Sequence, residues 1–129
     1  SSQLNLNSNR GLKAPSKPNN GSMMRIKKGK YRIKKSNGWI EEKGSAAYDY
    51  PLMIHRADGE KRWTVTHMAT GYSVKGQLSL RTAKELISRV KHYPIFLMPT
   101  IETWNLQMKI MQAKNPKKWD ELKGIIASF

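Results

Sequence analysis

Polar and apolar residues alternate over 30–42, which is the pattern of paired β-strands with one face buried and one face exposed. The dipeptide Asn37-Gly38 interrupts this alternation, and a two-residue hairpin turn with positive φ angles favours that dipeptide. We therefore predict a hairpin that closes on these two residues and pairs Ser36 with Trp39. Its strands, 30–36 and 39–42, put Tyr31, Ile33 and Ile40 on an apolar face and Arg32, Lys34, Trp39 and Glu41 on a basic face.

A second alternating stretch covers 52–68 and contains the turn dipeptide Asp58-Gly59. A two-residue loop there pairs Ile54 with Trp63, and a further turn at Thr70-Gly71 leads into another strand. The predicted apolar face carries Leu52, Ile54, Trp63, Val65, Tyr72 and Val74, and the polar face carries His55, Arg62, Thr64, Thr66, Ser73 and Lys75. This pattern predicts an antiparallel sheet with one apolar and one basic face.

Three stretches with helical spacing follow the predicted strands. Thr82 and Glu85 have the spacing of a capping box, Thr100 is a second N-cap, and Asn115-Pro116 is typical of a third helix start. The inward stripes are Leu86, Ile87 and Val90 in a helix over 82–92, then Ile101, Trp104, Met108 and Met111, and finally Trp119, Leu122, Ile126 and Phe129. We therefore predict an α+β fold, an antiparallel sheet of about four to five strands followed by about three C-terminal helices packed on its apolar face.

Two segments show neither the two-residue alternation of a strand nor the spacing of a helix. Residues 1–22 contain five Ser, five Asn, two Gly and two Pro, a composition that cannot form a core. We expect this segment to be a flexible tail, either a native arm or an expression tag, because Gly21-Ser22 is typical of a cloning junction. Residues 43–50 are rich in Gly, Ser and Ala and are predicted to be a linker. Residues 23–129 are then expected to form a single domain.

The chain carries 24 Lys and Arg against 9 Asp and Glu, a formal charge of +15. Such a field is informative about partners, and polyanions are the natural ones. A membrane is disfavoured because no apolar run approaches the roughly 18–20 residues of a spanning helix, and the first residues lack the apolar core of a secretory signal. With no Cys, a disulfide framework and thiol chemistry are excluded. We expect nucleic acid as the partner and the cytoplasm as the location, in a bacterial host if the protein is phage-encoded.

Candidate catalytic groups are few. The imidazoles are His55, His67 and His92, and the predicted sheet sends the first two to opposite faces, so they cannot share a metal ion. No spacing typical of a metal site, a phosphate-binding loop or a nucleophile elbow occurs. Turn, capping and helix-dipole roles account for acids near turns and helix starts. We therefore expect no catalytic activity, no cofactor and no metal, and we expect His67 to be packed in the core.

The stretch 25–35 holds seven Lys or Arg residues and no acid. Lys and Arg neutralise phosphates, and exposed aromatic rings stack on the bases of single strands, each base contributing about 1–3 kcal/mol. Trp39 is the aromatic candidate because the hairpin sets it beside Arg32 and Lys34. Alternatively, Trp39 packs under the tail or linker and the basic run only keeps the protein soluble. The other indoles, Trp63, Trp104 and Trp119, are expected in the core. The candidate nucleic-acid-binding residues are Arg25, Lys27, Lys28, Lys30, Arg32, Lys34, Trp39, His55, Arg62, Thr64, Thr66, Ser73 and Lys75.

The segment 62–90, RWTVTHMATGYSVKGQLSLRTAKELISRV, resembles two families in its order of elements and in the spacing around Trp63, Thr70-Gly71 and Thr82. It is similar to small single-stranded-DNA-binding proteins of the transcriptional-coactivator and phage type, in which a curved antiparallel sheet with a basic, aromatic face precedes a helix and the chain dimerises. It is also similar to the arm-type DNA-binding domain of tyrosine recombinases and its plant transcription-factor relatives, in which three strands enter the major groove. The first resemblance implies a binding face of Arg32, Lys34, Trp39, Arg62 and Lys75, and the second implies base contacts from His55, Arg62, Thr64, Thr66, Ser73 and Lys75. The two extra C-terminal helices depart from both families.

Three functional hypotheses follow. The first is a non-enzymatic nucleic-acid-binding protein that prefers single-stranded DNA and acts in phage or mobile-element replication, recombination or transcription. The second is a duplex-DNA-binding regulator or recombinase accessory that reads the major groove with its sheet. The third is a protein-interaction module that docks on a host polymerase or nuclease. If the last two C-terminal helices are not packed on the sheet, they are a candidate surface for a homodimer or a host protein.

Overall fold

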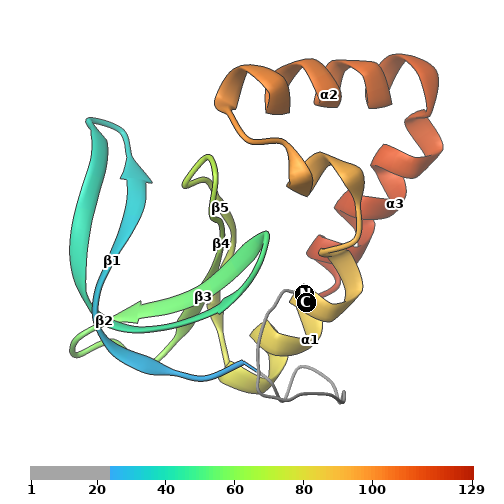
Figure 1. The fold of residues 1–129 in the computed structure, drawn as a ribbon. Coiled ribbons are helices and arrows are strands. Elements are labelled where there is room, and N and C mark those ends of the chain that lie inside the picture. The colour runs from blue at the N-terminus through green and yellow to red at the C-terminus, as the bar shows by residue number, and fades with distance from the viewer. Residues whose placement is uncertain (1–23) are drawn as a thin grey trace, which may run out of the picture.

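The computed structural model describes residues 24–129, so the predicted tail at 1–22 lies outside it. All strands precede all helices (Figure 1). The strands are β1 (Lys27–Lys35), β2 (Gly38–Asp49), β3 (Leu52–Ala57), β4 (Trp63–His67) and β5 (Ser73–Leu78). The helices are α1 (Leu80–Val90), the short 3₁₀ helix η3 (Pro94–Leu97), α2 (Ile101–Lys114) and α3 (Pro116–Ala127). The predicted α+β arrangement of an antiparallel sheet followed by three helices is confirmed.

The strands form one antiparallel sheet in the order β1-β2-β3-β4-β5. The long strand β2 pairs with β1 over 38–46 and with β3 over 44–49. The predicted linker at 43–50 is therefore wrong, because most of it is the second half of β2. Packing explains why this half of β2 is rich in small residues. The alanines of this half are buried, and a Cβ on Gly44 would lie only 2.1 Å from the carbonyl oxygen of Arg56.

Strand β2 bends, so the β1–β2 hairpin folds across β3, β4 and β5 instead of continuing their plane (Figure 1). The hairpin reaches the turn between β4 and β5, where the backbone N of Lys34 donates to the carbonyl of Gly71 at 3.3 Å. Gly71 has a φ of +74°, and a Cβ on it would lie 2.7 Å from Cβ of Lys34 and 2.8 Å from the ring of Trp39. The meeting point of hairpin and turn therefore requires glycine for both conformation and space.

In the first hairpin the predicted faces are confirmed although the predicted pairs are wrong. Lys34 pairs with Trp39, the turn consists of Ser36 and Asn37, and Gly38 starts β2 with a φ of +113°. Each partner thus lies two positions from the predicted one. A slip of two residues leaves every side chain on its face, because side chains along a strand alternate with a period of two.

The second hairpin shows the same difference. Ile54 pairs with Val65 instead of Trp63, because the connection over 58–62 is longer than the predicted two-residue loop. The faces are again preserved. All four apolar residues predicted for this hairpin are buried.

Strand β5 departs from strict alternation. Val65 pairs with Lys75 and Thr66 pairs with Ser73, so Val74 is an extra residue that bulges out of the ladder. The predicted position of Lys75 on the polar face is therefore wrong. Its side chain lies on the helix side of the sheet, where Nζ donates to a carbonyl at the end of α3 at 2.9 Å.

Helix α1 packs on the apolar face of the sheet, and its predicted inward residues Leu86, Ile87 and Val90 are fully buried. It begins earlier than predicted. Ser79 is the N-cap, and its Oγ accepts from the backbone N of Thr82 at 3.2 Å. The predicted N-cap at Thr82 is therefore wrong, because Thr82 is the third residue of the helix and its own amide is capped by Ser79.

Helices α2 and α3 extend the helical layer on the same side of the sheet as α1 (Figure 1). Thr100 caps α2 as predicted, with Thr103 bonding back to it. Asn115 precedes α3 as predicted, although its side chain makes no capping hydrogen bond. Met111 and Leu122 are buried, and most other members of the two predicted stripes pack partly buried against the same core.

The bend in β2 produces two apolar clusters. The main core lies between the sheet and the helices. The second lies inside the bend and consists of Tyr31, Ile33, Ala46 and Met53. The apolar face of the first hairpin therefore packs over the polar side of β3, β4 and β5, and not against the helices.

Candidate nucleic-acid interface

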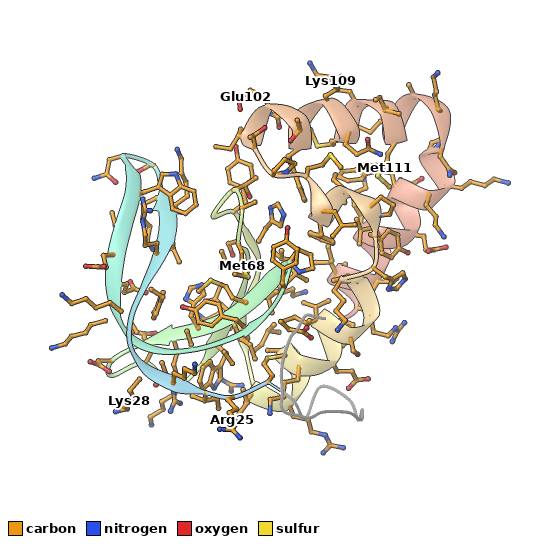
Figure 2. The ribbon with its side chains drawn as sticks, in the orientation of Figure 1. Arg25, Lys28, Met68, Glu102, Lys109 and Met111 are labelled. Atoms are coloured by element: carbon orange, nitrogen blue, oxygen red, sulfur yellow. The ribbon has the colours of Figure 1, made fainter. Side chains whose placement is uncertain are left out.

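Strand β1 and the residues just before it carry most of the predicted phosphate-binding side chains. This basic row consists of Arg25, Lys27, Lys28, Lys30, Arg32 and Lys34, all exposed except the half-buried Lys34. Figure 2 shows Arg25 and Lys28 along one edge of the molecule, with Arg25 the closer of the two to α1. Within 24–129 the row forms one ion pair, Lys30 with Glu41 at 3.8 Å between two exposed side chains. Such a pair contributes about 0–1 kcal/mol, so the row keeps nearly all its charge for an anionic partner.

Trp39 lies on the outer face of the hairpin, as predicted. The residue is 38% exposed, with the guanidinium carbon of Arg32 5.2 Å from the ring centroid. Atoms Cη2 and Cζ3 of the indole are close to Gly71. The ring is thus held in place by two neighbours while more than a third of its surface stays open to a ligand.

A shallow depression of about 600 Å³ adjoins Trp39, and we call it the aromatic hollow. Tyr48 lines it with 45% of its surface exposed. Both rings can therefore present surface to one ligand. The aromatic hollow is lined by Lys30, Tyr31, Arg32, Trp39, Glu41, Tyr48, Met53, Met68 and Ala69. The sequence pattern missed Tyr48 because 43–50 was interpreted as a linker.

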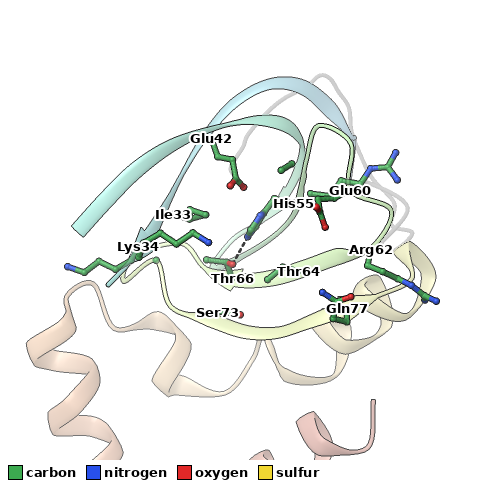
Figure 3. A pocket seen from close by; sticks show the side chains of 14 residues that line it. Ile33, Lys34, Glu42, His55, Glu60, Arg62, Thr64, Thr66, Ser73 and Gln77 are labelled. Carbon is green, nitrogen blue, oxygen red and sulfur yellow. Dashed lines mark hydrogen bonds between the residues drawn. The ribbon is translucent and has the colours of Figure 1, made fainter. Parts of the chain in front are cut away.

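A second depression of about 370 Å³ lies between the β1–β2 hairpin and strands β3 to β5 (Figure 3). We call it the polar cleft. Its walls include five of the predicted binding residues besides Lys34, namely His55, Arg62, Thr64, Thr66 and Ser73. The pattern missed the other polar residues of the cleft, which are Lys35, Glu42, Arg56, Glu60 and Gln77. They come together only through the bend in β2, which no local pattern predicts.

His55 forms part of the floor of the polar cleft. It lies on the polar side of β3 as predicted, but it is only 6% exposed because the hairpin covers it. Its Nε2 is 2.6 Å from Oγ1 of Thr66, and its ring centroid is 4.7 Å from that of Tyr31. Burial lowers the pKa of His55 to about 4, with Glu42 opposing the shift and Lys35 adding to it. The imidazole is therefore neutral at pH 7.

Glu42 faces this floor from the hairpin. Figure 3 shows its carboxylate pointing from β2 toward His55. The hydroxyl of Tyr31 donates to Oε1 of Glu42 at 2.6 Å. Burial, and then this hydrogen bond, raises the pKa of Tyr31 well above its ordinary value. One carboxylate oxygen is thus fixed by the tyrosine while the group remains directed into the cleft.

The predicted binding residues divide into three places. The basic row follows β1, and Trp39 lies at the start of β2 on the outer face of the same hairpin. The predicted residues His55, Arg62, Thr64, Thr66 and Ser73 line the polar cleft. The expectation that Trp39 and His55 share one surface is therefore wrong. Lys34 joins the two regions, because it pairs with Trp39 and also lines the cleft. Lys75 belongs to neither, since it bonds the end of α3.

His67 is packed in the core, which confirms its predicted role. It is fully buried, with Nδ1 2.8 Å from Oγ1 of Thr70 and Nε2 2.6 Å from the carbonyl of Phe96. Both ring nitrogens therefore have partners. Over residues 24–129, no three His, Cys, Asp or Glu side chains lie close enough together to hold a metal ion.

None of the helices in the part of the chain that the structure describes is long and apolar enough to cross a membrane. Comparison with protein-family models, curated proteins and solved structures gave no match. The two family resemblances of 62–90 therefore stay hypotheses.

Proposed function

We propose that this protein binds nucleic acid without catalysing a reaction and that it prefers single-stranded DNA. The observation that carries the proposal is the partly exposed Trp39, whose ring has the Arg32 guanidinium 5.2 Å from its centroid and lies beside the basic row, in which only Lys30 forms an ion pair among residues 24–129. A role in phage or mobile-element replication, recombination or transcription is part of the proposal and rests on the short, very basic composition.

The aromatic hollow supports a preference for single strands. Trp39 and Tyr48 line the same depression, and both are more than a third exposed. Base stacking on such rings contributes about 1–3 kcal/mol per base and tolerates any sequence. In a duplex the base faces are already stacked on each other, so these rings would gain nothing from it. A single strand can turn its bases into the hollow.

The basic row supports phosphate binding. Its side chains follow β1, and the adjacent acids neutralise little of their charge, since the pair of Lys30 with Glu41 is exposed. Each phosphate contact releases a condensed counterion, so the observed affinity falls with salt. For a strand that contacts four to six members of the row, the logarithm of affinity should fall with the logarithm of salt with a slope of about −3 to −4.

The geometry disfavours the major-groove hypothesis. That mode needs the polar face of β3, β4 and β5 to be open enough to enter a groove. His55 is 6% exposed and Thr66 is 2% exposed, and the first hairpin lies across this face. A duplex would have to displace the hairpin before the sheet could reach base edges.

The protein-interaction hypothesis has one favourable observation. Leu97, Leu106 and Ile110 are between 41% and 60% exposed, and the last two lie on α2. If docking through these side chains is the main function, oligonucleotide binding should be absent at physiological salt. A titration of the protein with an oligonucleotide therefore separates the protein-interaction hypothesis from the nucleic-acid-binding proposal.

The test is a competition experiment. The protein is titrated into a dye-labelled thymidine oligonucleotide of about ten nucleotides, a length within the site sizes of single-strand binders. Unlabelled single strands and matched duplexes then compete at about 50 mM and about 200 mM salt. The proposal predicts tighter competition by the single strand at both salts. Equal or better competition by the duplex would overturn it.

A further inference from the structure

The carboxylate of Glu42 is an acceptor without a cationic partner inside a cleft rimmed by cations. Among residues 24–129, no Lys, Arg or His nitrogen lies within 4 Å of it. Lys34, Lys35 and Arg62 all line the same cleft. Glu42 therefore forms no ion pair with them although three cationic side chains line its cleft. Over residues 24–129, the one hydrogen bond to the Glu42 carboxylate comes from the hydroxyl of Tyr31. This leaves acceptor capacity on a carboxylate that points toward the floor (Figure 3).

The floor of the polar cleft is a poor site for a phosphate. Its lining includes Thr64, Thr66, Ser73 and the neutral ring of His55, whose pKa the nearby charge of Lys35 helps to lower. A phosphate there would face the Glu42 carboxylate across a narrow space, and like charges at short range repel strongly. The exposed cations of the basic row suit a phosphate better. The interior therefore suits an uncharged group that carries N–H donors.

A nucleobase has the required chemistry and size. It offers N–H donors to a carboxylate and acceptors to hydroxyl, amide and ammonium groups. Its backbone can keep the phosphates outside the cleft, beside the exposed cations of the basic row. A volume of about 370 Å³ lies within the range of small-molecule sites, about 300–1,000 Å³. Gln77 adds a side-chain amide to the wall from a backbone with a φ of +60°, a conformation that non-glycine residues adopt rarely.

We propose that the polar cleft takes one unstacked guanine base of the bound strand, whose N1–H and N2–H groups donate to the carboxylate of Glu42. Of the common bases, guanine alone has two N–H donors side by side on its Watson–Crick edge, the arrangement that matches the two oxygens of a carboxylate. Its O6 and N7 are also the acceptors that Lys and Arg prefer. Hydrogen bonds to a charged acceptor are about twice as strong as neutral ones.

The cleft lies next to the stacking surface. Gly71 lines the cleft, and the ring of Trp39 packs against the same glycine from the aromatic hollow. A strand that stacks a base on Trp39 can thus turn a neighbouring base into the cleft, a movement that costs little when no partner strand is present. The inference rests on the proposed function, because the base reaches the cleft as part of a bound single strand.

The experiment compares two oligonucleotides of about ten nucleotides, one of thymidine only and one with a single central guanosine, by fluorescence polarisation. Wild-type protein should bind the guanosine-containing strand about tenfold more tightly. Glu42→Gln keeps an acceptor for Tyr31 and should lose this preference. Glu41→Gln is the matched control, since Glu41 lies on the outer face of the same strand, and it should keep the preference.

The outcomes are distinguishable from those of the proposed function. If wild-type protein binds both strands equally well, the guanine site is wrong and single-strand binding still holds. If the preference survives in Glu42→Gln, or disappears in Glu41→Gln as well, Glu42 is not its source and the inference is overturned. If neither strand binds, both the inference and the proposed function are wrong.

Discussion

The indole of Trp39 packs against the backbone of Gly71, so closely that a Cβ on the glycine would lie 2.8 Å from two ring carbons. This contact joins the tip of the first hairpin to the turn between β4 and β5. It also sets the boundary between the aromatic hollow and the polar cleft, both of which depend on the hairpin staying folded across the sheet.

We expect Gly71→Ala to destabilise the protein and to weaken binding. The φ of +74° costs an alanine about 1–3 kcal/mol, and the methyl group also displaces the indole. The free energy of unfolding in urea should fall by more than in Gly59→Ala, where φ is +90° but no atom lies within 4 Å of the new Cβ. If the free energy of unfolding falls equally in the two variants, the contact with Trp39 does not contribute to stability.

Replacing Trp39 with alanine should weaken single-strand binding by about 5- to 150-fold, which corresponds to one stacked base. The ring is partly exposed, so the cost in folding stability should be smaller than the cost in binding. Fluorescence polarisation with the thymidine oligonucleotide measures the affinity, and urea unfolding measures the stability. Tyr50→Ala is the control, because Tyr50 is 66% exposed but does not line the hollow. An unchanged affinity in Trp39→Ala would contradict the stacking role.

His55 makes folding stability depend on pH. Its pKa is about 4 in the folded protein and about 6.5 in an unfolded chain. Between these values the unfolded chain binds more protons, so the free energy of unfolding decreases as pH falls through this window and is fully present above pH 6.5. The loss from this group should reach about 3 kcal/mol at pH 4.

Urea unfolding at several pH values from 7 to 4 tests this dependence. His55→Gln should flatten the slope, because glutamine can bond Thr66 without titrating. The exposed His92, changed to Gln, should leave the slope as in wild type. His67 also has a lowered pKa, caused by burial, so part of the slope should remain in His55→Gln.

Lys75 should contribute to stability and not to binding. Its Nζ donates to the carbonyls of Ile126 and Ala127 at the end of α3, where a positive charge is favourable for the helix dipole. Lys75→Met keeps the aliphatic stem and should cost about 0.5–2 kcal/mol of unfolding free energy. Oligonucleotide affinity at a fixed salt concentration should change less than twofold, roughly the effect of a distant charge. A large loss of affinity in Lys75→Met would contradict this prediction and would indicate that Lys75 contacts the nucleic acid.

Which face a side chain occupies could be predicted from the sequence more reliably than which residue it pairs with. Both hairpins differ from prediction by two positions, yet Trp39 remains outside and Trp63 remains inside. The alternation of side chains has a period of two, and a slip of two leaves the faces unchanged. Strand β5 lacks this protection because the bulge at Val74 shifts the alternation by one, and for that reason Lys75 was misplaced.

The polar cleft could not be predicted because it depends on a bend. Small residues over 43–50 have low strand propensity, and their packing role at a tight crossing appears only in three dimensions, as at Gly44. With the bend unknown, the face of Tyr31 and the face of His55 could not be placed opposite each other. Glu42 was therefore missed, although its sequence position was always on the same side of β2 as Ile40.

Strand β1 is an edge of the sheet, and an edge strand offers free backbone groups to any other strand that approaches. Its closely spaced ammonium and guanidinium groups repel a second molecule of the same kind, so the charges that would attract a polyanion also guard against aggregation. Variants that neutralise several of them at once should lose colloidal stability along with affinity. Light scattering on such variants without ligand measures aggregation directly. It therefore separates aggregation of the free protein from a loss of ligand contacts.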